Sequence, residues 1–207
     1  MSMKKLTIKE VEDMGSDNLN YFGGVFEGGI HLQQISDEIV PCMNDIMESG
    51  VEINNYLEIG SAAGGSLYLF NYVFNLKNMV IIDDNKHHKH IHRPWVIKNI
   101  SGNVNEFIGN STDESVVKSV KDLGLGFDII LIDGWHGFKE VVADIKNYAG
   151  LLNKGGFLIL HDVETFGYIN KIWRELKDNG QYKASKKYVT EVYQLNCGIG
   201  LLQRSET

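Results

Sequence analysis

The sequence of 207 residues fits one domain, with room for a small N-terminal cap. Lys and Arg number 20 against 27 Asp and Glu, so the formal net charge is −7, which argues against a protein that binds nucleic acid through its phosphates. No apolar run reaches the roughly 18 residues of a membrane span, and the N-terminus lacks a secretion signal. Cys42 and Cys197 lie far apart, which indicates a reducing, cytoplasmic setting.

The N-terminal part is expected to be an arm followed by a cap helix. Residues 1–28 are polar and contain several glycines, so we expect a loosely ordered arm. Over residues 31–49 apolar side chains recur at steps of three and four, which is the pattern of an amphipathic helix. We therefore divide the chain into an arm and cap helix (1–50) and a main domain (51–207).

In the main domain, short apolar strands alternate with helical patterns. Strands are expected at 55–59, 79–82, 105–109, 127–132 and 156–160, and a closing hairpin at 189–194 and 198–203. Helices are expected at 67–74, 115–123, 138–152 and 168–178. This alternation predicts an α/β fold with a doubly wound, mostly parallel sheet, an antiparallel C-terminal hairpin and a helical N-terminal cap.

Polar residues follow five of the expected strands, at 58–60, 83–84, 110–113, 133–136 and 161–162. Open sheets of this kind bind their ligands beyond the carboxyl ends of the strands. We therefore expect the functional site to be built from these five groups.

The first strand leads into the glycine-rich turn LEIGSAAGGS at residues 57–66. A dinucleotide pyrophosphate requires G-x-G-x-x-G, whereas Ala62 occupies the middle glycine position here. The turn suits a ligand without phosphate whose amino-acid end carries an ammonium group. Glu58 can face that ammonium through water or hold the turn, and Ser66 with the helix amides can bind a carboxylate.

Asp83 ends the second strand, where its carboxylate can accept hydrogen bonds from both hydroxyls of an unphosphorylated ribose. Enzymes that use NAD and enzymes that use S-adenosylmethionine share this device, so Asp83 supports a nucleoside without choosing between them. The alternative is that Asp83 and Asp84 cap the next helix.

Taken together, these motifs resemble the class I S-adenosylmethionine-dependent methyltransferases, from about residue 55 onward. The resemblance rests on Glu58-x-Gly60-x-x-x-Gly64, Asp83, the 110–113 turn, Asp133 and the run LLNKGG at 151–156. It implies a seven-stranded Rossmann-like sheet and S-adenosylmethionine as cofactor. The residues that it implies for cofactor binding are Glu58, Gly60, Ser61, Gly64, Ser66, Asp83, Ser111, Thr112, Asp113 and Asp133.

The segment DGWHGF at 133–138 and the later pair His161-Asp162 narrow the resemblance. They resemble the branch with macrocin-type O-methyltransferases and cephalosporin hydroxylase-like proteins, and more distantly catechol and caffeoyl-coenzyme A O-methyltransferases. The branch implies a divalent cation, Mg²⁺ or Mn²⁺, held by Asp133, His161 and Asp162. The usual ligand at the position of His161 is an oxygen, so the imidazole favours Mn²⁺, Fe²⁺ or Zn²⁺, or a role for His161 as base or beside a metal ligand.

The same resemblance makes His136 and Asp133 the catalytic residues. His136 stands where catechol O-methyltransferase has its catalytic lysine, and a histidine of near-neutral pKa is a suitable general base. Trp135 would then lie beside the acceptor. The alternatives are that His136 only caps the helix that begins near residue 138, and that Asp144 on that helix makes a cap or an ion pair.

These features predict an S-adenosylmethionine-dependent O-methyltransferase for a small hydroxylated acceptor, such as a sugar or a secondary metabolite, assisted by a divalent metal. The alternatives are a metal-independent methyltransferase with His136 or His161 as base, an NAD-dependent oxidoreductase, and a non-catalytic scaffold. We expect a small-molecule partner and neither nucleic acid nor membrane, and the resemblance is compatible with a homodimer. The N-terminal arm, the histidine-rich segment 87–92 and the residues after Asp162 are expected to form the acceptor pocket, with segment 87–92 as a solvated loop.

Overall fold

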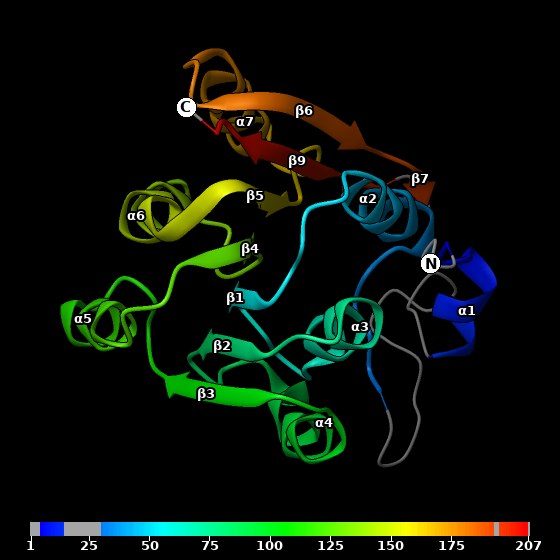
Figure 1. The fold of residues 1–207 in the computed structure, drawn as a ribbon, viewed down its shortest axis with the longest axis vertical. Coiled ribbons are helices and arrows are strands. Elements are labelled where there is room, and N and C mark those ends of the chain that lie inside the picture. Colours follow the sequence, from blue (N-terminus) through cyan, green and yellow to red (C-terminus); the bar gives the residue numbers. More distant parts are fainter. Residues whose placement is uncertain (1–4, 15–29, 193–194, 207) are drawn as a thin grey trace.

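The computed structural model describes residues 5–14, 30–192 and 195–206. Its centre is one sheet in the order β3-β2-β1-β4-β5-β9-β6 (Figure 1). Five parallel strands are followed by β9, which is antiparallel to both β5 and β6, so the expected mostly parallel seven-stranded sheet is confirmed. The strands are β1 (Asn55–Ile59), β2 (Asn78–Asp83), β3 (Asn103–Ile108), β4 (Phe127–Ile132), β5 (Leu152–His161), β6 (Tyr182–Tyr188) and β9 (Ile199–Arg204).

The inner strands are apolar because helices cover both faces of the sheet (Figure 1). In β4, Ile129 and Leu131 belong to the core on one face, and Ile130 and Ile132 belong to the core on the other. The first face is covered by α2 (Ser36–Glu48), α3 (Gly65–Phe74) and α4 (Arg93–Asn99). The second is covered by α5 (Glu114–Asp122), α6 (Phe138–Tyr148) and α7 (Gly167–Asp178), and the short helix η2 (Ala149–Leu151) follows α6.

The expectation of a loosely ordered arm is wrong for part of its length. The short helix α1 (Ile8–Asp13) begins with a capping box between Thr7 and Glu10, and Val11 is fully buried. Residues 1–4 and 15–28 of the expected arm lie outside the described part. The cap helix α2 starts at Ser36, so residues 30–35 precede it in non-helical form.

The hairpin partner of β9 is β6, and the strand expected at 189–194 is not part of the main sheet. β6 has the sequence YKASKKY, in which lysines mask the strand pattern because this edge strand has an exposed face. A two-stranded ladder of β7 (Glu191–Val192) and β8 (Leu195–Asn196) occupies the connection instead. Residues 193–194 lie outside the described part.

The histidine-rich segment is a short helix, η1 (His88–His92), that leads directly into α4, and the expectation of a solvated loop is wrong. The charged residues beside the histidines explain the difference. Lys89 and Arg93 are 7% and 2% exposed, so the segment is anchored by two cationic side chains that turn inward.

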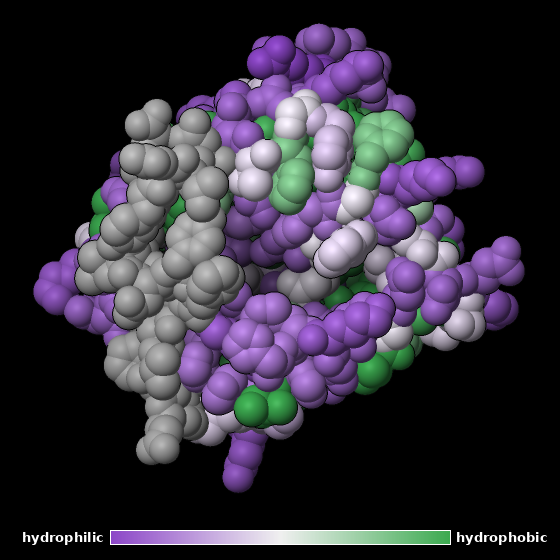
Figure 2. Space-filling model, turned by 180° about the vertical axis from the view of Figure 1, so that it is seen from behind, coloured by the Kyte–Doolittle hydropathy of each residue, from purple (hydrophilic) through white to green (hydrophobic). Residues whose placement is uncertain are grey.

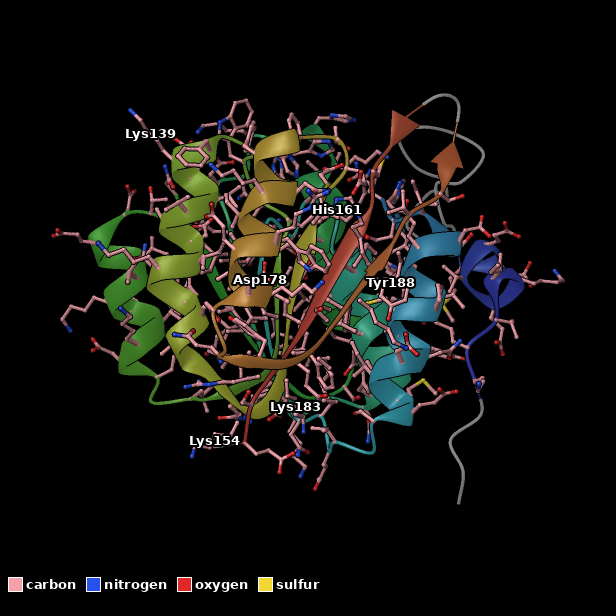
Figure 3. The ribbon with its side chains drawn as sticks, turned by 90° about the horizontal axis from the view of Figure 1, so that it is seen from above. Lys139, Lys154, His161, Asp178, Lys183 and Tyr188 are labelled. Carbon is pink, nitrogen blue, oxygen red and sulfur yellow. The ribbon has the colours of Figure 1, made fainter. Side chains whose placement is uncertain are left out.

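The polar groups expected at the strand ends all lie at one edge of the sheet. Figure 3 shows His161 at this end of β5, and Lys154 and Lys183 at the opposite end of the molecule. Figure 2 looks onto the edge where the parallel strands end. The surface there is mainly hydrophilic and hollowed near its centre, with hydrophobic side chains gathered beside the hollow.

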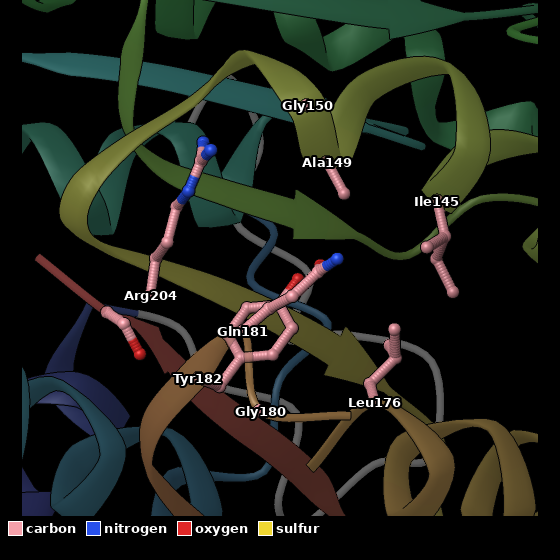
Figure 4. Close-up of a pocket in the computed structure, with 9 residues that line it drawn as sticks. Ile145, Ala149, Gly150, Leu176, Gly180, Gln181, Tyr182 and Arg204 are labelled. Carbon is pink, nitrogen blue, oxygen red and sulfur yellow. The ribbon is translucent and has the colours of Figure 1, made fainter. Parts of the chain in front are cut away.

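A cavity of about 510 Å³ lies at the other edge, between the ends of α6 and α7 and the start of β6 (Figure 4). Its lining includes Leu176, Tyr182 and Arg204. Arg204 is the last residue of β9, whereas Ile199 at the start of β9 pairs with His161, so about 17 Å of strand separates the two. The cavity therefore belongs to a different part of the molecule from the strand-end groups. Within the described ranges, no helix has the length and apolar character needed to cross a membrane.

Candidate active site

Four side chains from the ends of β4 and β5 converge at the carboxyl edge: Asp133, His136, His161 and Asp162. One ligand atom from each lies within 4.8 Å of the other three. His136 Nε2 is 2.9 Å from Asp162 Oδ2 and 3.5 Å from Asp133 Oδ1, and His161 Nδ1 is 3.2 Å from both of these oxygens. Asp162 has a φ of +57°, a left-handed conformation that is unfavourable for a residue with a Cβ and is typical of functional sites.

The two carboxylates keep both imidazoles protonated. Burial disfavours the imidazolium of His136, but hydrogen bonds with Asp133 and Asp162 outweigh it and raise its pKa to about 10. Burial also opposes charge on His161, and the Asp133 and Asp162 carboxylates raise its pKa to about 9. Burial raises the pKa of Asp162, but its contacts with the two histidines hold that pKa well below the usual range. The expected near-neutral pKa of His136 is therefore wrong for the metal-free protein.

Aromatic side chains that the sequence analysis missed hold His136 in place. The ring of Phe166 stacks on the imidazole with centroids 5.3 Å apart, and the Tyr168 hydroxyl donates to the His136 carbonyl oxygen. Gly137 is the N-cap of α6 and makes no side-chain cap, so the alternative that His136 caps this helix is wrong. Trp135, the residue before His136, is 78% exposed.

The glycine turn after β1 follows a left-handed path, with φ of +86° at Gly60, +40° at Ala62 and +80° at Gly64. It also packs tightly against the backbone of Asp133 at the end of β4. A Cβ on Gly60 would lie 2.1 Å from the Asp133 carbonyl oxygen, so only glycine allows the two strand ends to approach this closely. Gly64 is the N-cap of α3 and makes no side-chain cap, and the first amides of a helix, which lack partners within it, are suited to a carboxylate.

Glu58 is completely buried beneath the turn. The Ser61 hydroxyl lies 3.5 Å from Glu58 Oε2, which supports a role in holding the turn. Burial raises the pKa of Glu58 to about 8, with further contributions from the charges on Asp133 and Asp83. Ser61 and Ser66 are 4% and 8% exposed, so the predicted residues at the methionine end lie in the interior.

Asp83 contacts the glycine turn directly, and it has a buried cationic partner, Arg93, that the sequence analysis missed. Its Oδ2 accepts from the Ala62 amide at 2.8 Å, and Oδ1 accepts from the Asn85 amide at 2.8 Å and lies 3.3 Å from Arg93 Nη1. Arg93 also donates to the Ala62 carbonyl at 2.8 Å and to Glu106 at 2.7 Å. A carboxylate has about four acceptor positions, so Asp83 keeps room for a ribose hydroxyl.

The turn after β3, which is predicted to contact adenine, is held by a hydrogen bond from the end of α6. The Tyr148 hydroxyl donates to the Ser111 carbonyl at 2.6 Å, and Thr112 donates to Asn110 Oδ1 through both its amide and its hydroxyl. Asp113 is the N-cap residue of α5 without capping it through its side chain. Asp144 makes no ion pair among the described residues but has a side-chain hydrogen bond with Ser111. It is 1% exposed, and burial raises its pKa to about 6.

Comparison with known proteins gives the same class as the fold and the site. Residues 57–163 match the family model described as a methyltransferase domain, so the chain belongs to this methyltransferase family. Its sheet and the order of its strand-end groups are those of the class I S-adenosylmethionine-dependent methyltransferases.

Individual relatives agree with this class. The chain is 31% identical over 154 residues to an uncharacterized protein of Acanthamoeba polyphaga mimivirus, with 69% of each chain covered. Its fold is similar to that of a putative caffeoyl-CoA O-methyltransferase from Staphylococcus aureus (15% identity, 97% of this chain and 93% of that chain, TM-score 0.64). It is also similar to the O-methyltransferase TomG from Streptomyces achromogenes, solved with SAM (12%, 80% of each chain, 0.63). A further match is the MycE methyltransferase of mycinamycin biosynthesis, solved with Mg and SAH (14%, 98% of this chain and 56% of that chain, 0.61).

Proposed function

We propose that the protein is an S-adenosylmethionine-dependent O-methyltransferase that acts on a small hydroxylated acceptor, a sugar or a secondary metabolite, with the help of a divalent cation. S-adenosylmethionine would occupy the glycine turn, Asp83 and the 110–113 turn. The family match, and the SAM and SAH complexes of the similar structures TomG and MycE, support the cofactor. The cation would be held by Asp133, Asp162 and His161.

The convergence of two carboxylates and two imidazoles, with one ligand atom from each within 4.8 Å of the others, is the observation that carries the metal-assisted proposal. The charge state of the two histidines supports it. A metal-independent methyltransferase would need His136 or His161 as a neutral base at physiological pH. With pKa values of about 10 and 9, both imidazoles are already protonated at that pH. A protonated imidazole has no free lone pair with which to accept the proton of an acceptor hydroxyl. A cation bound to Asp133, Asp162 and His161 would neutralise the same two carboxylates. The pKa of His136 would then fall, and His136 could lose its proton.

The donor set fits a divalent cation. Ligand atoms about 2.1 Å from a metal lie up to about 4.2 Å apart, close to the 4.8 Å spread of the cluster. His161 Nδ1 faces the carboxylate oxygens Asp133 Oδ1 and Asp162 Oδ2 at 3.2 Å, so a cation between them would lie within reach of this nitrogen. With imidazole among the donors, Mn²⁺, Fe²⁺ or Zn²⁺ suits the site better than Mg²⁺.

When bound, S-adenosylmethionine supplies the methyl group, and the cation lowers the pKa of the acceptor hydroxyl. Asp133 and Asp162 hold the imidazoles of His136 and His161 in position. His136, oriented by Phe166 and Tyr168, takes the hydroxyl proton on Nε2. Trp135, the neighbour of His136 in the chain, has an exposed ring against which the acceptor would lie. Catalysis would rest mainly on this alignment of hydroxyl and methyl group.

The proposal is tested by transfer of labelled methyl groups to a panel of sugar and phenol acceptors, with and without EDTA. We expect activity that EDTA abolishes and that added Mn²⁺ restores. Asp162→Asn should remove activity, whereas Asp178→Asn at the far end of α7 should not. Activity that survives both EDTA and Asp162→Asn would contradict metal assistance, and a protein that binds no SAH would favour the non-catalytic scaffold.

A further inference from the structure

One side chain of the cap segment contacts the cluster of Asp133, His136, His161 and Asp162 directly. Gln34, which precedes α2, donates from Nε2 to Asp133 Oδ2 at 3.0 Å, although 99 positions separate the two residues in the chain. Gln34 is only 2% exposed, so the contact is formed inside the protein. The two oxygens of Asp133 are thereby divided: Oδ2 is bound to the cap, and Oδ1 lies 3.2 Å from His161 and 3.5 Å from His136.

The segment that carries Gln34 is firmly mounted on the cofactor turn. A Cβ on Gly65 would lie 2.3 Å from the His31 carbonyl oxygen and 2.5 Å from the Cα of Leu32, so the cap backbone lies directly against the start of α3. Leu32 is fully buried. The His31 ring stacks on His92 with centroids 3.9 Å apart and an interplanar angle of 21°. Gln34 therefore extends from a fixed backbone, and its amide can determine where a carboxylate points.

We propose that Gln34 is a positioning residue for the reaction: its amide withholds Asp133 Oδ2 from the cluster and turns Oδ1 toward the ligand position between His136 and His161. This inference rests on the proposed function, because the group that Asp133 is positioned to meet is the divalent cation. A neutral amide is suited to the task because it donates a hydrogen bond without adding a charge that would compete with a cation. Because segment 30–35 touches both Gly65 and Asp133, it also connects the cofactor turn to the catalytic carboxylate.

The experiment compares Gln34→Met with Gln33→Met. Methionine keeps the unbranched shape of glutamine but cannot donate, and Gln33 is the same residue type at the neighbouring position. Mn²⁺ binding is followed by electron paramagnetic resonance, and SAH binding by calorimetry. Partners that orient a metal ligand typically account for tenfold to a hundredfold in metal affinity, so we expect Gln34→Met to weaken Mn²⁺ binding by about that factor. SAH affinity should stay unchanged, and Gln33→Met should match the wild type in both titrations.

Three results would overturn the inference, and they separate it from the proposed function. Equal Mn²⁺ affinity in Gln34→Met and the wild type would refute the positioning role alone. A parallel loss of SAH and Mn²⁺ binding would show that Gln34 supports the fold in general. A wild-type protein that binds SAH but no Mn²⁺ would refute both this inference and the metal part of the proposed function. If Gln34→Met does not fold, Gln34→Asn provides the same test, because its amide is one methylene too short to reach Asp133.

Discussion

Replacing Gly60 by alanine tests the contact between the glycine turn and Asp133, the residue after β4. An added Cβ would lie 2.1 Å from the Asp133 carbonyl oxygen, and such contacts do not occur below 3.0 Å. Asp133 must therefore move by about 0.9 Å, the difference between these distances. A left-handed residue other than glycine costs about 1–2 kcal/mol, and overpacking costs about 1–3 kcal/mol. We expect Gly60→Ala to lower the free energy of unfolding by about 2–5 kcal/mol.

Gly50→Ala is the matched control, because Gly50 has a φ of +72° but nothing within 4 Å of an added Cβ. It should show only the backbone cost of about 1–2 kcal/mol. The difference between the two variants in the free energy of unfolding, measured in urea, gives the cost of the clash alone. Displacement of a catalytic group by about 1 Å also lowers rates by about a hundredfold, so methyl transfer by Gly60→Ala should fall by that factor. Equal stability of the two variants, with normal methyl transfer by Gly60→Ala, would refute the reasoning.

Two further predictions concern buried charge. Arg93→Met leaves Asp83 without its buried cation and should lower the free energy of unfolding by about 3–5 kcal/mol in urea; a loss below about 1 kcal/mol would contradict the role assigned to Arg93. The raised pKa values of His136 and His161 stabilise the metal-free fold fully below the ordinary histidine pKa of 6.5, and this stability is lost as the pH rises through about 9 and 10. The lowered pKa of Asp162 adds stability above its ordinary value of 3.8, which is lost as the pH falls. Urea denaturation across pH should therefore show greatest stability between about pH 4 and 6.5, and a profile that keeps rising to pH 10 would contradict this charge arrangement.

The parallel core of the fold could be predicted because its signals are local. The unbroken apolar runs of β2 and β4 require cover on both faces, and the polar groups that follow β4 and β5 have to meet at one edge. The convergence of Asp133, His136, His161 and Asp162 follows from that rule.

What could not be predicted depends on tertiary contacts. β6 has no apolar alternation because none of its residues is buried, and so the sequence pattern favours 189–194 as the strand instead. Arginine and glutamine usually lie on the surface, so the sequence gives no sign that Arg93 and Gln34 are buried. Only the folded chain shows Arg93 against Asp83 and Gln34 against Asp133. The pKa of His136 depends on two carboxylates from different strands, which no local pattern contains.

The account is tested most directly by calorimetric titration of the purified protein with S-adenosylhomocysteine and, separately, with NAD. A glycine turn shaped for a ligand without phosphate predicts saturable binding of S-adenosylhomocysteine to one site per chain and no heat from NAD. Saturable heat from NAD, with none from S-adenosylhomocysteine, would contradict the assignment of the turn and, with it, the roles proposed for the metal cluster and for His136.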